Sequence, residues 1–212
     1  MTFTERFPDV VTPNPGGPLD PLGESVLDES QPWLRCFDPV DTRLVIGRGQ
    51  DPHRELLVDH ARADGVPIHR RVCGGGAVVL APGMLVIALR LPRGDRFPDA
   101  WLQHLGGVLA EGLSSPEHPV LVRGHGDLAI ATEGGERKVL GSSLRLTGPW
   151  CIYLASLLLS DQRSRMDRYL ASPSREPDYR KGRGHGEFCA WLDLAPDLAQ
   201  ERIETACKRA FP

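Results

Sequence analysis

The apolar residues of this chain fall into short runs separated by glycine, proline and charged residues, and this spacing predicts β-strands over much of the chain. Two of the expected strand pairs are hairpins, one across the Ala81-Pro82-Gly83 turn and one around Gly134-Gly135. The strands are expected at residues 33–37, 43–47, 66–71, 77–80, 84–91, 128–131, 137–140 and 150–159.

Other segments carry apolar residues at helical spacing. Trp101, Leu105 and Leu109 mark one amphipathic face that is expected to pack on the sheet, and Asp51-Pro52 is typical of an N-cap and first turn. The helices are expected at residues 53–63, 98–112, 161–170 and 197–211. Because strands and helices do not alternate regularly, the pattern indicates an α+β fold, with a mainly antiparallel sheet and helices packed on it.

The composition is that of an ordinary globular protein. Of 212 residues, 41% are hydrophobic and 25% are charged, which suits one sizeable domain with its own core. Residues 1–32 hold six prolines with few apolar residues between them. We therefore expect an irregular, Pro-rich N-terminal arm at 1–32 and one domain over 33–212.

Charge and cysteine usage narrow the class of protein. The net charge is −3, which argues against general nucleic-acid binding. No apolar run approaches the ~18 residues that a membrane span needs, and no secretory signal opens the chain. The five cysteines are odd in number and form no C-x-x-C pair, so neither a disulfide framework nor a zinc site is indicated, and a reducing cytoplasm is expected.

A glycine-rich basic stretch is the first candidate for chemistry. It reads Arg70-Arg71-Val72-Cys73-Gly74-Gly75-Gly76-Ala77. Three glycines let the backbone approach a ligand and direct successive N–H groups at it, and two arginines add charge suited to a phosphate or carboxylate. Glycine triplets also occur in plain turns, so the stretch alone does not establish an anion site.

A lysine in the second predicted hairpin is the other candidate. Lys138 lies on a strand between the Gly134-Gly135 turn and the corner Gly141-Ser142. An exposed lysine beside a turn is commonly only a solvated charge. Together with the glycine stretch, however, it suggests a site for an acyl-adenylate or another anhydride of phosphate.

Three motifs in this order carry a resemblance to a known family. They are Arg70-Arg71-x-x-Gly74-Gly75-Gly76-Ala77-Val78, Gly126-Asp127-Leu128 and Arg137-Lys138-Val139-x-Gly141-Ser142. They resemble the lipoate-protein ligases, which belong with biotin protein ligases and octanoyltransferases, and the likeness covers about residues 33–192. The resemblance implies the catalytic-domain fold of that family.

The resemblance also implies a two-step reaction. Lipoate, or octanoate, and ATP give an acyl-adenylate and pyrophosphate, with Mg²⁺ accompanying ATP, and a lysine of an acceptor protein then takes the acyl group. Lys138 is the implied catalytic residue, stabilising negative charge on the phosphoryl and carboxyl oxygens. The implied adenylate-binding residues are Arg70, Cys73, Gly74, Gly75, Gly76, Ala77, Val78, Asp127, Val139, Gly141, Ser142 and Arg183.

Asp127 and three apolar residues have alternatives that the sequence leaves open. Asp127 is expected to bind the metal or the ribose, or only to cap a turn. Val78, Val79 and Leu140 are expected either to line an apolar slot for the acyl chain or to belong to the ordinary core. The sequence departs from the family in having His125-Gly126 where an Arg-Asn pair is common, and Leu154-Ala155-Ser156 where His-Gly-Thr is common.

The expected acceptor is a lipoyl domain, a protein like the glycine cleavage H protein, or a lipoate-binding protein. The basic segment from Pro173 to His185 resembles short ligases that serve lipoate-binding proteins of sulfur oxidation. It is expected to receive an acidic acceptor or the ATP phosphates, or to be a solvated loop. We expect no C-terminal accessory domain of the kind found in two-domain ligases, and therefore either a separate accessory chain or a ligase that needs none. The basic residues of the Pro173–His185 segment are Arg175, Arg180, Lys181, Arg183 and His185.

Three other functions compete with this interpretation. An octanoyl or lipoyl transferase acts through a cysteine without ATP, but neither of that group's cysteine motifs is present. A biotin ligase is related, yet its Gly-Arg-Gly-Arg type of loop is missing, and a non-catalytic lipoate-binding module has no need of Lys138. The glycines do not have G-x-G-x-x-G spacing, which excludes a Rossmann-type dinucleotide site.

Overall fold

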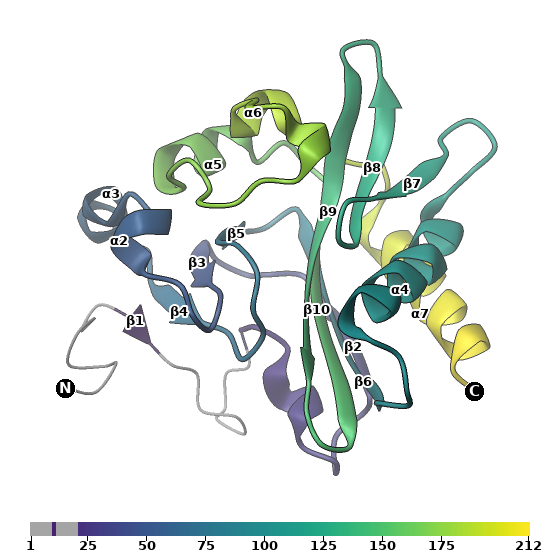
Figure 1. The fold of residues 1–212 in the computed structure, drawn as a ribbon. Helices are drawn as coiled ribbons and strands as arrows, with labels where there is room; N and C mark the ends of the chain where they lie inside the picture. The colour runs from purple at the N-terminus through teal and green to yellow at the C-terminus, as the bar shows by residue number, and fades with distance from the viewer. Residues whose placement is uncertain (1–9, 12–20) are drawn as a thin grey trace.

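The computed structural model describes the backbone of residues 10–11 and the whole of residues 21–212, and it is built around two β-sheets (Figure 1). The strands are β1 (Val10–Val11), β2 (Leu34–Phe37), β3 (Arg43–Ile46), β4 (Ile68–Arg70), β5 (Val78–Leu80), β6 (Met84–Pro92), β7 (Val120–Arg123), β8 (Asp127–Thr132), β9 (Gly135–Leu146) and β10 (Trp150–Leu158). The helices are η1 (Glu24–Leu27), α2 (Pro52–Glu55), α3 (Val58–Ala63), α4 (Pro98–Leu113), α5 (Arg163–Tyr169), η2 (Asp178–Arg180), α6 (His185–Phe188) and α7 (Pro196–Ala210).

The larger sheet has six strands in the order β2-β6-β10-β9-β8-β7, and every neighbouring pair in it is antiparallel. The smaller sheet has the order β1-β4-β3-β5, with β4 parallel to both β1 and β3. This arrangement confirms the predicted α+β class with a mainly antiparallel sheet.

Alternation along β6 explains how the layers are joined. Side chains of successive strand residues point to opposite faces, and Leu85 and Ile87 lie in the core that α4 and α7 cover. Met84 and Val86 lie in the second core, which includes Leu44 of β3 in the smaller sheet. The larger sheet is thus buried between two helices on one face and the smaller sheet on the other (Figure 1).

The predicted hairpin between residues 77–80 and 84–91 is wrong. Strand β5 pairs with β3, whereas β6 pairs with β2 and β10, so the chain crosses from one sheet to the other at the intervening turn. Gln162 donates to Pro82 O at 2.9 Å and Ser160 donates to Gly83 O at 3.2 Å, which holds the crossing in place. The sequence of a continuous apolar strand does not specify which strand it pairs with, because strands buried on both faces lack the alternation of apolar and polar residues that sets register.

The predicted helix over 53–63 is two short helices. Asp51 accepts a hydrogen bond from His53 N–H at 3.0 Å, which confirms the expected N-cap. The helix breaks at Leu56, which forms a β-bridge with Leu170, and Leu57 N–H donates to Tyr169 O at 2.8 Å. Tertiary pairing therefore overrides local helix propensity. The sequence pattern also missed β7, and α5 is shorter than expected.

The described end of the expected N-terminal arm is packed on the domain. Residues 24–27 form η1, so irregular structure was the wrong expectation there, and Leu22 and Val26 are buried. Glu24 Oε1 accepts a hydrogen bond from Val72 N–H at 2.7 Å, which ties the arm to the glycine stretch. The rest of the arm, residues 1–9 and 12–20, lies outside the described residues.

Among the helices of residues 21–212, none combines the length and apolar character that crossing a membrane requires.

Candidate active site

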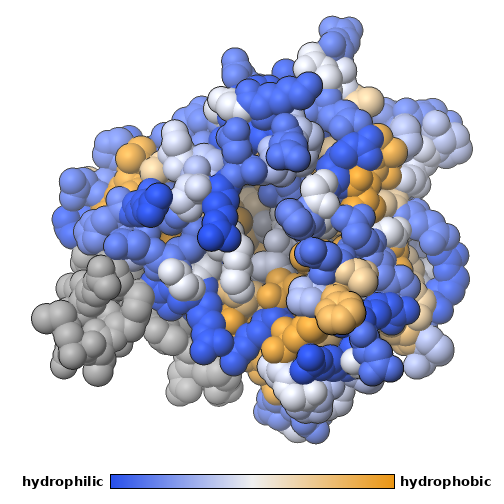
Figure 2. All heavy atoms as spheres, viewed as in Figure 1, coloured by the Kyte–Doolittle hydropathy of each residue, from blue (hydrophilic) through white to orange (hydrophobic). Residues whose placement is uncertain are grey.

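A cavity of about 690 Å³ opens where the two sheets and the segment of residues 171–189 meet. A narrower apolar extension of about 110 Å³, here called the slot, continues from it. Figure 2 shows this face hollowed near its middle, with hydrophilic residues around much of the hollow. The residues shared by cavity and slot are Gly76, Ala77, Val78, Lys138, Gly141, Ser142 and Ser156.

The slot is lined mainly by apolar side chains, which suits a hydrocarbon chain rather than a polar group. They come from both sheets and from the N-terminal segment. Lys138 lies in the part shared with the cavity, and Arg71 and Ser143 are the polar residues that line only the slot. The apolar residues that line only the slot include Leu22, Val45, Leu80, Val86 and Leu154.

The glycine loop 74–76 lies at the mouth of the slot in a fixed shape. Gly75 has φ 87°, which an L-residue rarely adopts, and a Cβ atom at Gly47 would overlap Gly75 O. The buried Arg71 guanidinium donates to Gly74 O at 2.7 Å and to Gly76 O at 2.6 Å. Within the described chain, the N–H groups of the loop donate no hydrogen bond, and Gly76 lines both the cavity and the slot.

Both arginines of the motif donate hydrogen bonds to backbone carbonyl groups, Arg71 within the glycine loop and Arg70 in the neighbouring turn at residues 47–50. Arg70 donates to Gly47 O at 2.8 Å, Arg48 O at 2.7 Å and Gln50 O at 2.7 Å. Burial lowers the pKa of Arg71 to about 10, which leaves it cationic at neutral pH. The structure therefore places the guanidinium of Arg70 on carbonyl oxygens of the neighbouring turn, not in the cavity.

A β-bulge in β9 orients Lys138. Leu128 of β8 faces Leu140, whereas the next residue, Ala129, faces Lys138, so Val139 is an extra residue on β9. Val139 and Leu140 both lie in the core beneath α4 and α7. The shift in alternation puts Lys138 and Gly141 on the cavity face together, as β-bulges near active sites commonly do.

Gly141 leaves room for the lysine side chain. A Cβ atom at position 141 would lie 2.9 Å from both Cε and Nζ of Lys138. Lys138 thus crosses directly over the glycine, which explains why the motif has no larger residue there.

Asp127 and Lys138 form an ion pair in the cavity wall. Lys138 Nζ lies 2.8 Å from Asp127 Oδ1, with side-chain exposures of 27% and 14%. The second oxygen, Oδ2, accepts a hydrogen bond from Tyr179 Oη at 3.0 Å. Burial and then the Asp127 charge raise the pKa of Tyr179, so the phenol stays protonated and donates.

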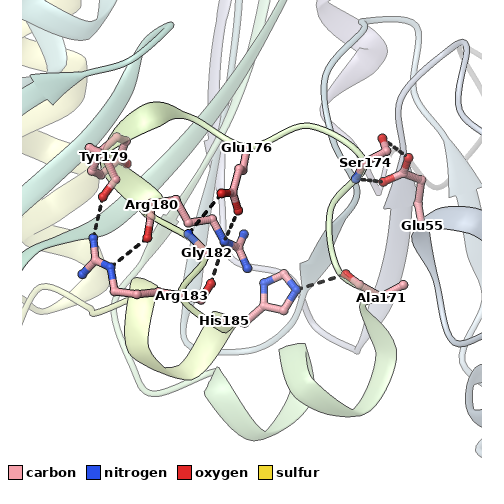
Figure 3. A network of polar contacts seen from close by, with 9 residues as sticks. All are labelled: Glu55, Ala171, Ser174, Glu176, Tyr179, Arg180, Gly182, Arg183 and His185. Atoms are coloured by element: carbon pink, nitrogen blue, oxygen red, sulfur yellow. Dashed lines mark hydrogen bonds and ion pairs between the residues drawn. The ribbon is translucent and has the colours of Figure 1, made fainter.

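The segment of residues 171–189, called the cover segment below, is held over the cavity by its own polar contacts (Figure 3). Arg183 donates to Glu136 O at 3.0 Å, Tyr179 O at 2.7 Å and Arg180 O at 3.0 Å. Ser174 donates its hydroxyl to Glu55 of α2. The segment is therefore anchored at both ends rather than solvated as a loose loop.

The structure brings only part of the predicted site together. Cys73 is buried with its thiol 3.8 Å from Ile152 O, Val139 lies in the core, and Leu140, proposed for the slot, lies there too. Arg70 and Arg183 bond to backbone carbonyls, and Gly74 and Gly75 lie in the loop beside the cavity. The predicted residues that line the cavity are Gly76, Ala77, Val78, Asp127, Lys138, Gly141 and Ser142, with Val79 from the predicted slot.

Several cavity residues were missed by the sequence analysis. Tyr179 follows Asp127 by 52 positions in the chain, so no local spacing reveals their contact. Ser156 and Glu55 also line the cavity. The one available signal was the apolar run 150–159, in which a serine at the centre of a buried strand is unusual.

The cysteines near the site are unsuited to act as thiolates. Burial raises the pKa of Cys73 and of Cys151 to about 12. Cys189 lines the cavity, and burial raises its pKa as well. A thiol with a raised pKa is a poor nucleophile at neutral pH.

Residues 21–212 contain no cluster of three or more histidine, cysteine or acidic side chains that suits a metal ion. Both oxygens of Asp127, the predicted metal ligand, are engaged by Lys138 and Tyr179. The residues present therefore do not form a ready Mg²⁺ site in this arrangement.

Comparison with known proteins gives a family match over most of the chain. Residues 22–211 match the model of the lipoyl protein ligase A/B catalytic domain. Two similar solved structures are from Thermoplasma acidophilum. The first is a bipartite lipoate protein ligase, 17% identical with TM-score 0.73, covering 87% of this chain and 75% of that one. The second, a putative lipoate protein ligase with bound lipoic acid, is 16% identical with TM-score 0.69, covering 83% and 71%.

A third similar structure is that of a lipoate-protein ligase A bound with ATP. It is 17% identical, has a TM-score of 0.72, and the match covers 87% of this chain and 76% of that chain. At these identities the structures establish a shared fold, which is the ligase catalytic-domain fold expected from the sequence.

Proposed function

The chain belongs to the family of lipoyl protein ligase A/B catalytic domains and is an enzyme of that family, and on this basis we propose that it is an ATP-dependent lipoate-protein ligase. It activates lipoate as lipoyl-AMP and then transfers the lipoyl group to a lysine of an acceptor protein. The likeness to a ligase bound with ATP and to one with bound lipoic acid supports these substrates.

One observation carries the proposal: a half-buried lysine lies where an apolar slot meets a glycine loop with available N–H groups. An apolar acyl chain with a carboxylate at one end matches that arrangement. With the hydrocarbon chain in the slot, the carboxylate of the substrate lies beside Lys138.

In the first step, a lipoate carboxylate oxygen attacks the α-phosphorus of ATP. The new P–O bond forms as the bond to the bridging oxygen of pyrophosphate breaks, and that oxygen keeps the electron pair. Lys138 turns from Asp127 toward the reacting oxygens and offsets charge that two anions bring together, which is worth about 3 kcal/mol of barrier for one preorganised group. The N–H groups of Gly74–Gly76 donate to the same oxygens.

In the second step, the acceptor lysine amine attacks the carbonyl carbon of lipoyl-AMP. An N–C bond forms, the C–O bond to the phosphate breaks, and AMP leaves with the electron pair, while nitrogen loses one proton. Lys138 holds the carbonyl oxygen as negative charge develops there.

The slot suits a medium-length acyl chain. Each buried CH₂ contributes about 0.8 kcal/mol, so octanoate is a second substrate that differs from lipoate mainly by lacking the ring. Mg²⁺ enters as part of the ATP substrate, because the described residues form no separate metal site.

For the acceptor we propose a lipoyl domain or a related lipoate-binding protein. One of the similar ligases was solved as part of a lipoylation system with its E2 lipoyl domain, which supports this class of acceptor. Two further points remain predictions from the sequence: that the acceptor is a lipoate-binding protein of sulfur oxidation, and that a separate accessory chain takes part.

A transferase that works through a cysteine is the second candidate, because Cys189 lines the cavity. The raised pKa of this buried thiol disfavours it, since the thiolate is the nucleophile in such enzymes.

The proposal is tested by measuring pyrophosphate release with ATP, Mg²⁺ and lipoate, octanoate or biotin in parallel. We expect release with lipoate and octanoate and none with biotin. Acyl transfer from an octanoylated carrier protein without ATP, together with no pyrophosphate release, would contradict the ligase and establish the transferase.

A further inference from the structure

His185 lies in the cavity wall next to Lys138. It is the first residue of α6 and lines the cavity. Ala190 N–H donates to Lys138 O at 2.9 Å, and Cys189, one helical turn after His185, forms a β-bridge with Lys138. These backbone contacts fix α6 against β9 at the level of the lysine.

The tautomer of His185 follows from its hydrogen bond. Its Nε2 lies 3.2 Å from Ala171 O, and because a carbonyl oxygen only accepts, Nε2 carries the hydrogen. Figure 3 shows this nitrogen turned toward Ala171. The other nitrogen, Nδ1, has no hydrogen-bond partner among residues 21–212, so the neutral ring presents a lone pair for a proton.

The surroundings of His185 favour this neutral form. Burial lowers its pKa, the positive charges of Arg180 and Lys138 lower it further, and the contact with Ala171 and the charge of Asp167 act in the opposite direction. The other charged side chains near α6 or across the cavity are Glu187 of α6, Arg163 of α5, Glu55 of α2, Asp127 of β8, and Arg175, Glu176, Asp178 and Arg183 of the cover segment.

The other proton acceptors of the cavity are already engaged or stand at its rim. Asp127 contacts Lys138 and Tyr179 with its two oxygens, and Glu55 accepts the Ser174 hydroxyl. Glu176 and Asp178 are exposed, and Glu176 pairs with Arg180. The His125 side chain is 81% exposed, and its Nδ1 lies 3.3 Å from Asp99 Oδ1. His185 is thus the half-buried base with an available nitrogen beside Lys138.

We propose that His185 is a catalytic residue of the transfer step, and this inference rests on the proposed function. As the acceptor amine forms its N–C bond with lipoyl-AMP, the nitrogen becomes acidic and its proton passes to His185 Nδ1. The C–O bond to the phosphate breaks, and AMP keeps the electron pair. The adenylation step has no such proton to move, because its nucleophile is already a carboxylate, so His185 acts only in transfer.

The test uses His185→Gln, because the glutamine amide can still donate to Ala171 O but has no basic nitrogen. Adenylation is measured as pyrophosphate release with lipoate, ATP and hydroxylamine, which removes the adenylate as a hydroxamate. Transfer is measured separately in a single turnover from synthetic lipoyl-AMP to Nα-acetyl-lysine amide. We expect adenylation to stay within about twofold of wild type and transfer to fall about 100-fold.

The pH profile separates a base from a merely structural residue. The logarithm of the wild-type transfer rate should rise with a slope of about two below the pKa of His185 and about one above it, since both the acceptor amine and the imidazole must be deprotonated. In His185→Gln the slope should stay near one throughout. His118→Gln, an exposed histidine in the α4–β7 loop, is the matched control.

Three results would overturn the inference. They are unchanged transfer in His185→Gln, an equal fall in adenylation and transfer, and loss of transfer in His125→Gln with His185→Gln unaffected. In each, wild-type adenylation leaves the proposed function standing. No pyrophosphate release from the wild type would instead overturn the proposed function, and this inference with it.

Discussion

Strands β8 and β9, here called the strand wall, and the cover segment enclose the same cavity, but their positively charged side chains have different kinds of partner. On β9, Lys138 has one carboxylate partner, Asp127, which in the proposed reaction it exchanges for a substrate anion. In the cover segment, Arg183 donates to three backbone carbonyls. A cation bound to several carbonyls holds the chain, whereas a cation with a single exchangeable partner beside a cavity is available for chemistry.

The glycine loop repeats this distinction. Both arginines of its motif donate to backbone carbonyl oxygens, and the anion-binding groups that we propose are the backbone N–H groups of the loop. In the proposed site Arg70 and Arg71 therefore hold the loop in shape, and Arg71 also lines the slot.

The largest expected effect is at the exchangeable cation. Lys138→Ala should lower the rate of pyrophosphate release with lipoate by about 100- to 1,000-fold, because one preorganised charge at the reacting oxygens is lost. The fold should be retained, since the side chain lies over Gly141 at the cavity and not in the core, and Asp127 keeps its hydrogen bond from Tyr179. Lys208→Ala, on the exposed face of α7, is the control, and an active Lys138→Ala enzyme would exclude the assigned role.

A smaller effect is expected when Lys138 is kept but displaced. Gly141→Ala places a methyl group 2.9 Å from Nζ, and the flexible side chain gives way, so pyrophosphate release should fall about 10-fold or more. Gly148→Ala, where a Cβ meets nothing within 4 Å, is the matched control near the other end of β9. Full activity in Gly141→Ala would show that the position of the ammonium group is not critical.

The smallest effect on chemistry is expected at the structural cation. Arg183→Ala leaves carbonyl groups without a donor, which should lower the free energy of unfolding by about 1–3 kcal/mol. Hydrogen exchange should speed up mainly in residues 171–189, with adenylation reduced only a few-fold. The exposed Lys181 of the same segment, which does not line the cavity, serves as the control when changed to alanine. Loss of adenylation as severe as in Lys138→Ala would remove the distinction between the two walls.

The parts of the site that the sequence predicted are those encoded by adjacent residues. The glycine loop, the β8–β9 hairpin and the lysine are local patterns, and the structure brings Gly76, Lys138 and Gly141 together at the cavity. The bulge at Val139 was not predictable, because it depends on how β8 pairs with β9.

The errors concern contacts between residues far apart in the chain. Strand β5 was assigned to β6 rather than β3, since buried apolar strands do not specify a partner. Tyr179 and His185 reach the cavity through the fold of the cover segment, and composition gave no indication that its arginines would be satisfied by carbonyls.

The most direct test of the central claim is mass spectrometry of the wild-type protein after incubation with lipoate, ATP and Mg²⁺ and without an acceptor. The account predicts lipoyl-AMP bound to the wild type and none on Lys138→Ala. Wild-type protein that forms no lipoyl-AMP under these conditions would contradict it.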